Sequence, residues 1–174
     1  MAKEPVFYSF HFANDVFRVQ QVRNMGVVDG DEPVSPNDWE TLKRKGDSAV
    51  EKWIDENMKY TRCVIVLIGS ETASRRWVTF EIAKAWKENR GILGIYIHNL
   101  KCPRSGTCVM GENPFNNWLV GGQTMAKHVN CYNPRADNAY LDIATNLQSW
   151  VASAIAQAKS RANSQAESSG EPLV

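Results

Sequence analysis

The segment whose residues are best suited to chemistry places a tryptophan and a glutamate four residues apart, at Trp77 and Glu81. If a helix begins at Ser74, then Val78 and Ile82 form its buried stripe, and Glu81 lies beside that stripe on the same side as Trp77. A carboxylate in this position can favour positive charge that develops on a ligand in an adjacent cleft. The alternative is an ordinary exposed glutamate with lysine neighbours along the helix, and spacing alone favours that alternative.

Five short segments rich in β-branched and aromatic residues predict the strands that would position this helix. They cover residues 6–10, 27–28, 62–68, 92–97 and 129–132. Residues 62–68 are apolar almost throughout, which is typical of a central parallel strand covered on both faces. Helical spacing follows Asn14 or Asp15, either of which can cap a helix, and recurs at 47–58, 74–89 and about 137–159. This alternation predicts an α/β fold, with a central, mostly parallel five-stranded sheet and helices on both faces.

The carboxyl ends of the predicted strands mark where a ligand should bind, because open α/β sheets bind ligands beyond those ends. The residues there are Ser9, Phe10 and His11 after the first strand, with 69–70 and 98–99 after two later ones. Asp38 and Trp39 follow the second strand, and a helix cap followed by a packing residue is their alternative. Trp77 is equally well interpreted as an anchor in the core, and His11 as a surface histidine.

Two regions lack a clear pattern. Residues 99–127 contain repeated proline and glycine, and a loop of that length is usually functional or irregularly packed. Residues 160–174 are rich in Ser, Ala, Gln and Glu without a core-forming pattern. We therefore expect one domain over residues 1–160 and a disordered tail over 161–174.

Composition and motifs exclude several classes of protein. The net charge of +1 provides no overall field to attract nucleic acid or an anionic membrane. The longest apolar stretch, 63–68, is too short to span a bilayer, and the N-terminus lacks the apolar core of a secretory signal. The sequence also lacks a G-x-G-x-x-G turn, a P-loop and a G-x-S-x-G elbow. We expect a cytoplasmic protein that binds neither nucleic acid nor membrane.

The four cysteines do not resemble a disulfide framework, and reduced thiols are expected. Cys102 and Cys108 have five residues between them, with His98, His128 and Cys131 nearby in the sequence. Structural zinc sites usually contain cysteine pairs with two to four intervening residues. Unrelated thiols are therefore the favoured interpretation, no metal is expected, and zinc is the minor alternative.

Three of these segments together resemble a TIR domain. They are Phe7-Tyr8-Ser9-Phe10, the strand at 63–68 followed by Gly-Ser, and residues 74–82, which include Ser-x-x-Trp-x-x-x-Glu. The Ser-Phe-His after the first strand, the Arg-Arg-Trp-Val before Glu81 and the Asn-Pro-Phe at 113–115 resemble the bacterial TIR-like group more closely. That group includes the TIR protein of the Thoeris anti-phage system. The similarity in element order spans residues 6–150.

The resemblance implies a flavodoxin-like TIR fold and an enzyme that cleaves the nicotinamide–ribose bond of NAD with a glutamate at the position of Glu81. NAD is then a substrate, and no cofactor is needed. The product would be a cyclic ADP-ribose-type signal that activates a partner effector after a phage-derived trigger. The residues expected to bind substrate around Glu81 are Ser9, Phe10, His11, Asp38, Trp39 and Trp77.

Two competing functions remain open, a non-catalytic TIR-like signalling module and a domain that binds a nucleotide without cleaving it. The chain also departs from the TIR pattern in three places. The first strand has no acidic residue at its start, residues 26–36 differ from the usual signalling loop, and residues 99–127 form an insertion. Product isomer, oligomeric state and the role of that insertion stay open.

Overall fold

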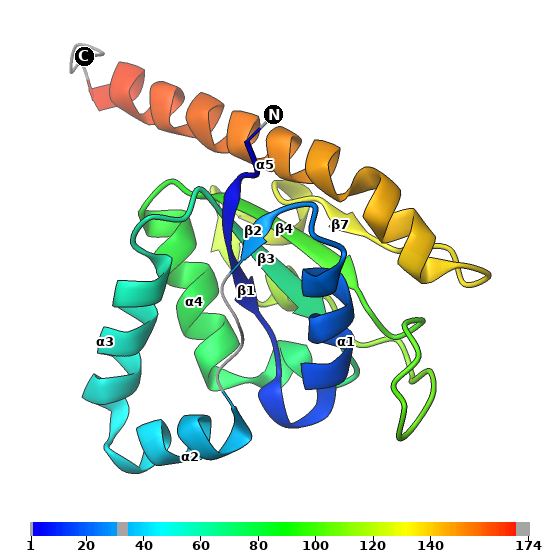
Figure 1. Cartoon of the computed structure of the whole chain (residues 1–174). Helices are drawn as coiled ribbons and strands as arrows, with labels where there is room; N and C mark the ends of the chain where they lie inside the picture. Colours follow the sequence, from blue (N-terminus) through cyan, green and yellow to red (C-terminus); the bar gives the residue numbers. More distant parts are fainter. Residues whose placement is uncertain (1, 31–34, 170–174) are drawn as a thin grey trace.

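A five-stranded parallel sheet in the order β2-β1-β3-β4-β7 forms the centre of the molecule (Figure 1). The computed structural model describes residues 2–30 and 35–169. The strands are β1 (Pro5–Ser9), β2 (Asp29–Gly30), β3 (Cys63–Ile68), β4 (Gly91–Tyr96) and β7 (Cys131–Tyr132). The strand order reverses between β1 and β3, which are neighbours, so their carboxyl ends flank the switch point where doubly wound sheets bind ligands. This confirms the expected α/β fold.

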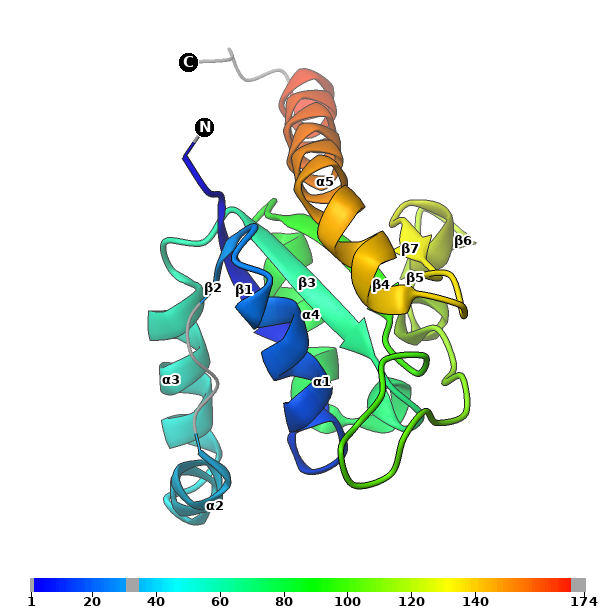
Figure 2. The same cartoon turned by 45° about the vertical axis from the view of Figure 1, so that its right-hand side comes forward.

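Helices cover both faces of the sheet. The helices α1 (Phe12–Asn24) and α5 (Ala139–Ser169) pack on one face, while α3 (Asp47–Met58) and α4 (Arg76–Lys87) pack on the other. Figure 2 shows α1 in front of the sheet and α4 behind it. Every residue of β3 and β4 is buried, because both strands lie between two helical layers.

One helix was not expected from the sequence. The sequence patterns predict no helix between residues 28 and 47, but α2 (Pro36–Arg44) forms there. Ser35 accepts a hydrogen bond from the Asp38 backbone N–H at 3.1 Å, and proline occupies the first helical turn. Serine and proline are favoured both at the start of a helix and in turns, so these residues are compatible with either structure. The predicted strand at 27–28 is also displaced, since β2 forms at Asp29–Gly30 and Val28 packs in the core.

The starts of two helices differ from the sequence prediction. Ser74 does not cap α4; it ends the 3-10 turn η1 (Thr72–Ser74), and its hydroxyl donates to the Glu71 carbonyl. Buried Thr72 closes this turn by accepting from the Gly69 N–H at 2.8 Å. The start of α1 is also earlier than Asn14, because His11 occupies its N-cap position.

The long segment at 99–127 is irregular but well packed. It contains η2 (Pro114–Asn117), the short hairpin β5 (Leu119–Val120) and β6 (Gln123–Thr124), and η3 (Met125–Lys127). Phe115 and Met125 are buried in the core on the α3–α4 side. A Cβ atom on Gly111 would lie 2.0 Å from the Gly69 carbonyl oxygen, so this segment crosses the end of β3 at very close range.

The last helix is longer than expected. Helical structure was predicted to stop near Lys159, yet α5 continues to Ser169. The expected disorder of residues 161–174 is therefore wrong as far as Ser169, and residues 170–174 lie outside the described part. Ala, Gln, Lys and Arg dominate residues 156–165, and all of them favour helix even without a buried stripe. None of the described helices is long and apolar enough to cross a membrane.

Candidate active site

Glu81 lies at the carboxyl end of β1, where it meets a buried serine. It occupies the second turn of α4, and only 6% of its surface is exposed. Ser9, fully buried at the last position of β1, donates its hydroxyl hydrogen to Glu81 Oε2. The interpretation of Glu81 as an ordinary exposed glutamate is therefore wrong. The sequence places these residues 72 positions apart, and the sheet brings them into contact.

The environment of Glu81 favours the neutral carboxylic acid. Burial raises the pKa of Glu81 to about 8, and the hydrogen bond from Ser9 opposes that rise. This pKa favours the protonated carboxyl group at pH 7. A positively charged ligand next to it would lower the pKa and favour the carboxylate.

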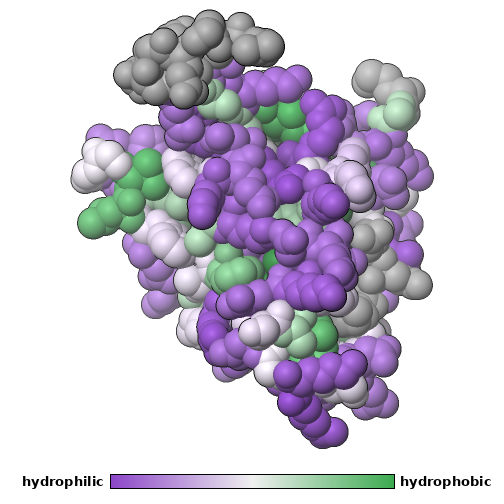
Figure 3. All heavy atoms as spheres, turned by 90° about the vertical axis from the view of Figure 1, so that its left-hand side faces the viewer, coloured by the Kyte–Doolittle hydropathy of each residue, from purple (hydrophilic) through white to green (hydrophobic). Residues whose placement is uncertain are grey.

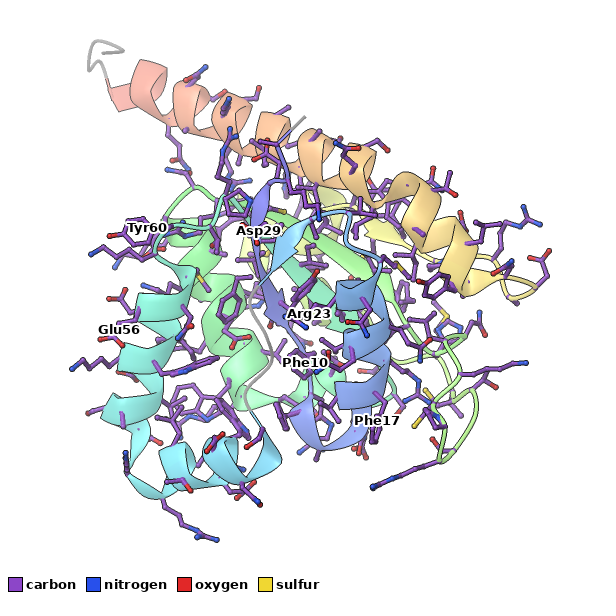
Figure 4. The ribbon with its side chains drawn as sticks, in the orientation of Figure 1. Phe10, Phe17, Arg23, Asp29, Glu56 and Tyr60 are labelled. Carbon is purple, nitrogen blue, oxygen red and sulfur yellow. The ribbon has the colours of Figure 1, made fainter. Side chains whose placement is uncertain are left out.

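A row of aromatic rings extends from the end of β1 to α2 and α3. Phe10 stacks on Phe12 with 5.6 Å between ring centroids, and Phe12 stacks on Trp39 at 6.2 Å. Trp39 in turn meets Trp53 of α3 edge to face at 5.9 Å. Figure 4 shows Phe10 where the chain leaves β1. The structure thus brings together two predicted site residues, Phe10 and Trp39, through a third ring that the sequence prediction omitted.

His11 belongs to a charged cluster at the same edge of the sheet. Its Nδ1 lies 3.7 Å from Glu71 Oε2, which accepts hydrogen bonds from Asn14 at 2.6 Å and Arg75 at 3.0 Å. Burial and the Arg75 charge lower the pKa of His11, whereas Glu71 opposes this. His11 is therefore neutral at pH 7. The sequence prediction missed Glu71, although its position just after β3 is a signal of the same kind as that of Ser9.

Asp38 makes the contacts expected of a residue that caps a helix, and Trp77 makes those expected of a packing residue. Asp38 is exposed and accepts a hydrogen bond from the Ser35 hydroxyl at 2.6 Å, so it takes part in capping α2. Trp77 is half-buried, packs edge to face on Phe80 at 5.6 Å, and lies 4.7 Å beneath the Arg76 guanidinium. Contact of either side chain with a substrate stays a prediction.

The cysteines and histidines do not converge on a metal site. Within residues 2–30 and 35–169, no group of three or more His, Cys, Asp and Glu side chains is arranged to hold a metal ion. All four cysteines are free thiols, and Cys102 is buried in a tight loop whose backbone pairs with Gly106. The minor alternative of a zinc site therefore has no ligand set in the described part of the chain.

Comparison with known proteins identifies a family that matches this chain. The model of a family described as Thoeris protein ThsB, TIR-like domain, matches residues 7–102, more than half of the chain. A protein of Bacillus cereus (strain MSX-D12) named "Putative cyclic ADP-D-ribose synthase ThsB1" is 36% identical over 121 residues. That match covers 67% of this chain and 62% of the relative, which is less than two thirds of the relative's length. The family match includes both Ser9 and Glu81.

Proposed function

The chain belongs to the family of Thoeris ThsB TIR-like domains, and from this premise we propose that it cleaves the nicotinamide–ribose bond of NAD and forms a cyclic ADP-ribose-type product. The observation that carries the proposal is the buried carboxyl group of Glu81, held by Ser9 at the carboxyl end of β1. The name of the Bacillus cereus relative supports the same activity. A domain that only binds other proteins has no need for such a group.

The chemistry of the bond fits a single carboxylate. Nicotinamide leaves as a neutral molecule because its ring nitrogen is already cationic, so no general acid is required. Cleavage passes through an oxocarbenium-like transition state, as in glycoside hydrolysis. Ionised Glu81 would stabilise this positive charge more strongly in the transition state than in the ground state. The cationic nicotinamide ring would itself favour ionisation of Glu81 on binding.

Cyclisation requires that an atom of the same ligand reaches the anomeric carbon before water does. The rings of Phe10, Phe12 and Trp39 form an apolar surface next to the end of β1. We propose that these rings hold a flat part of the folded substrate and exclude water. His11 lies at the charged edge of the site, beside Glu71, and we assign it a role in substrate binding.

The wider role follows as part of the same proposal. The cyclic product acts as a diffusible signal to an effector protein, and phage infection supplies the trigger for synthesis in the cytoplasm. NAD is the substrate, and no separate cofactor takes part.

The decisive test compares Glu81→Gln with a matched control. Purified wild-type protein, Glu81→Gln and Glu56→Gln are incubated with NAD, and nicotinamide and cyclic product are separated by chromatography. Glu56 is exposed on the outer side of α3, so Glu56→Gln makes the same Glu-to-Gln replacement away from the site (Figure 4). Glu81→Gln should lower product formation at least about a hundredfold, whereas Glu56→Gln should retain wild-type activity.

A cell-based arm covers the case in which activity needs infection. The same three proteins are produced with their effector in cells challenged with phage. Protection should be lost only with Glu81→Gln. Equal protection by wild type and Glu81→Gln would reject the enzymatic proposal and favour the non-catalytic module.

A further inference from the structure

A surface cavity of about 330 Å³ lies between the end of α4 and the last turns of α5. In this region α5 passes over the end of the sheet at which β1 and β3 begin, opposite to the end that holds Glu81 (Figure 1). The volume falls within the lower range of small-molecule sites. The lining residues are Trp86, His128, Gln157, Ser160, Arg161 and Ser164.

Arg161 has hydrogen-bonding capacity that its protein contacts do not use. Its guanidinium lies 4.1 Å from the centroid of the Trp86 ring, and Nη2 donates to the Arg90 carbonyl at 3.1 Å. Its Nε is buried without a hydrogen-bond partner. Among the described side chains, at residues 2–30, 35 and 37–165, no carboxylate forms an ion pair with it. Burial lowers the pKa of Arg161, yet a guanidinium remains charged at neutral pH.

The remaining lining residues supply neutral polar groups and a second ring. Gln157, Ser160 and Ser164 share one face of α5 with Arg161, because they are spaced three and four residues apart. The His128 ring centroid lies 6.4 Å from that of Trp86, and the two rings are tilted at 58°. The Arg161 guanidinium, hydroxyl groups and two rings therefore surround one cavity. That set suits an oxyanion attached to a flat group.

We propose that this cavity binds a phosphate-bearing small molecule, with Arg161 pairing with the phosphate oxygens. A guanidinium can form two parallel hydrogen bonds to a phosphate. A base or another flat group of the ligand would lie beside Trp86 and His128. The inference does not depend on NAD cleavage, since no lining residue belongs to the site around Glu81.

The test measures binding of three probes to the full chain. Inorganic phosphate, adenosine monophosphate and adenosine are titrated into labelled protein, and the NMR signal of the Arg161 side-chain N–H is followed. Both phosphate-bearing probes should saturate with a Kd on the order of 1 mM or tighter, and adenosine should bind at least about tenfold more weakly. Stronger binding of the monophosphate than of phosphate identifies a nucleotide site, whereas equal binding identifies a site for free phosphate.

Two substitutions on the same helix separate this site from any other. Arg161→Gln should weaken binding of adenosine monophosphate, followed by calorimetry, at least about tenfold, the loss expected for one charged hydrogen-bonded contact. Lys159→Gln removes the same charge from an exposed residue outside the cavity and should change nothing. Equal affinity in wild type and Arg161→Gln, or no saturable binding of any probe, would overturn the proposal.

A second variant decides the matter if Arg161→Gln does not fold. Ser160 is exposed, so Ser160→Asp places a carboxylate in the cavity without disturbing the core. The new carboxylate should repel phosphate in the cavity and reduce affinity at least about tenfold. Unchanged affinity in Ser160→Asp would also contradict the site. Thermal unfolding confirms that each variant is folded.

Discussion

Glu81 is buried, yet its proposed role requires a negatively charged carboxylate, and burial opposes that charge. Removal from water favours its neutral form, while stabilisation of an oxocarbenium ion requires the carboxylate. The Ser9 hydroxyl reduces the conflict by donating to the carboxylate, although it does not remove it. The bound substrate supplies the positive charge that the protein itself does not place there. Activity should therefore depend on pH in a predictable direction.

We expect kcat/KM for NAD to rise with pH up to a pKa of about 8 and then to level off. This parameter reports ionisation of the free enzyme, in which Glu81 must lose a proton to act. Below the pKa, the slope should be about tenfold per pH unit. The apparent pKa in kcat should be lower, because the cationic substrate is already bound. Initial rates between pH 6 and 9.5 test this expectation, and a flat profile would contradict it.

Ser9→Ala is the matched control for this profile. Loss of the hydroxyl donor raises the pKa of Glu81 further, so kcat/KM at pH 7 should fall while the rates at the highest pH converge with wild type. A uniform loss at every pH would mean that Ser9 acts in some other way.

The same burial predicts a stability cost at Glu81. The folded-state pKa is raised, so the stabilising contribution is complete below about pH 4.5 and is lost as pH rises toward 8. Glu81→Gln keeps the shape without a titrating group. At pH 7 it should increase the free energy of unfolding by on the order of 3 kcal/mol, since about 2.5 pH units separate pH 7 from the unfolded pKa. Urea unfolding at pH 4.5 and 7 measures the difference, which should nearly vanish at the lower pH.

At the scale of elements, α1 holds the start of the long 99–127 segment through one buried ion pair. Arg18 donates to Asp15 at 3.1 Å and also to the carbonyls of Leu100 at 2.9 Å and Gly106 at 2.8 Å. Asp15 lies against the end of β3, where a Cβ on Gly69 would sit 2.1 Å from its Oδ2. The pair therefore joins α1, β3 and this segment at the edge of the site.

Removal of Arg18 should be costly because it isolates the buried Asp15. Arg18→Met should reduce the free energy of unfolding by about 3–5 kcal/mol, the usual cost of breaking a buried pair on one side. Asp15→Asn in the same chain removes the unpaired charge and should restore part of that loss. Denaturant unfolding of the single and double variants provides the comparison. A double variant no more stable than Arg18→Met would show that the loop contacts, rather than the charge, dominate.

The elements that the sequence predicts well are those with a self-contained pattern. The helix at 47–58 matches α3 at both ends, and the apolar run at 62–68 matches β3 within one residue. The two-residue strands β2 and β7 are harder to predict, because they exist only by pairing with neighbours. For α2, the Ser-Pro-x-Asp start is equally typical of a turn, so the sequence does not predict this helix.

The residues of the candidate site also differ in how well the sequence predicts their positions. Ligand sites lie at the carboxyl ends of strands, and β1 and α4 are both recognisable from their patterns. The sequence therefore predicts that Ser9 lies near Glu81. The ring row from Phe10 to Trp53 could not be predicted, since it depends on where α2 lies relative to α1 and α3. Likewise, no local pattern indicates that Arg161 would stack on Trp86, 75 positions earlier in the chain.

At the scale of the whole molecule, apolar side chains are sparse on the face formed by α2 and α3 (Figure 3). The net charge is +1, and the face formed by α2 and α3 is mostly hydrophilic with small separate hydrophobic areas (Figure 3). Large exposed apolar side chains elsewhere include Leu119 on β5 and Phe17 on α1. Scattered residues of this kind are normal on soluble proteins.

The two ends of the sheet carry separable functions if both proposals hold, and α5 allows a test of that separation. Among its described side chains, at residues 139–165, the last buried one is Ala158, whereas Ser160, Arg161 and Ser164 line the cavity near Trp86. A chain that stops after Lys159 keeps the whole buried stripe. It loses the Arg161–Trp86 stacking and one hydrogen bond, which together contribute about 1–2 kcal/mol.

We therefore expect the chain that ends at Lys159 to fold, with a transition temperature lower by about 2–8 °C, and to cleave NAD within about twofold of wild type. Binding of adenosine monophosphate should be lost. A chain that ends at Trp150 is the contrast, because it also removes the buried Val151, Ala154, Ile155 and Ala158 and should not fold. Circular dichroism during heating, with chromatography of NAD products, distinguishes the two chains. If the longer chain also failed to fold, the last turns of α5 would be part of the core domain rather than an added ligand site.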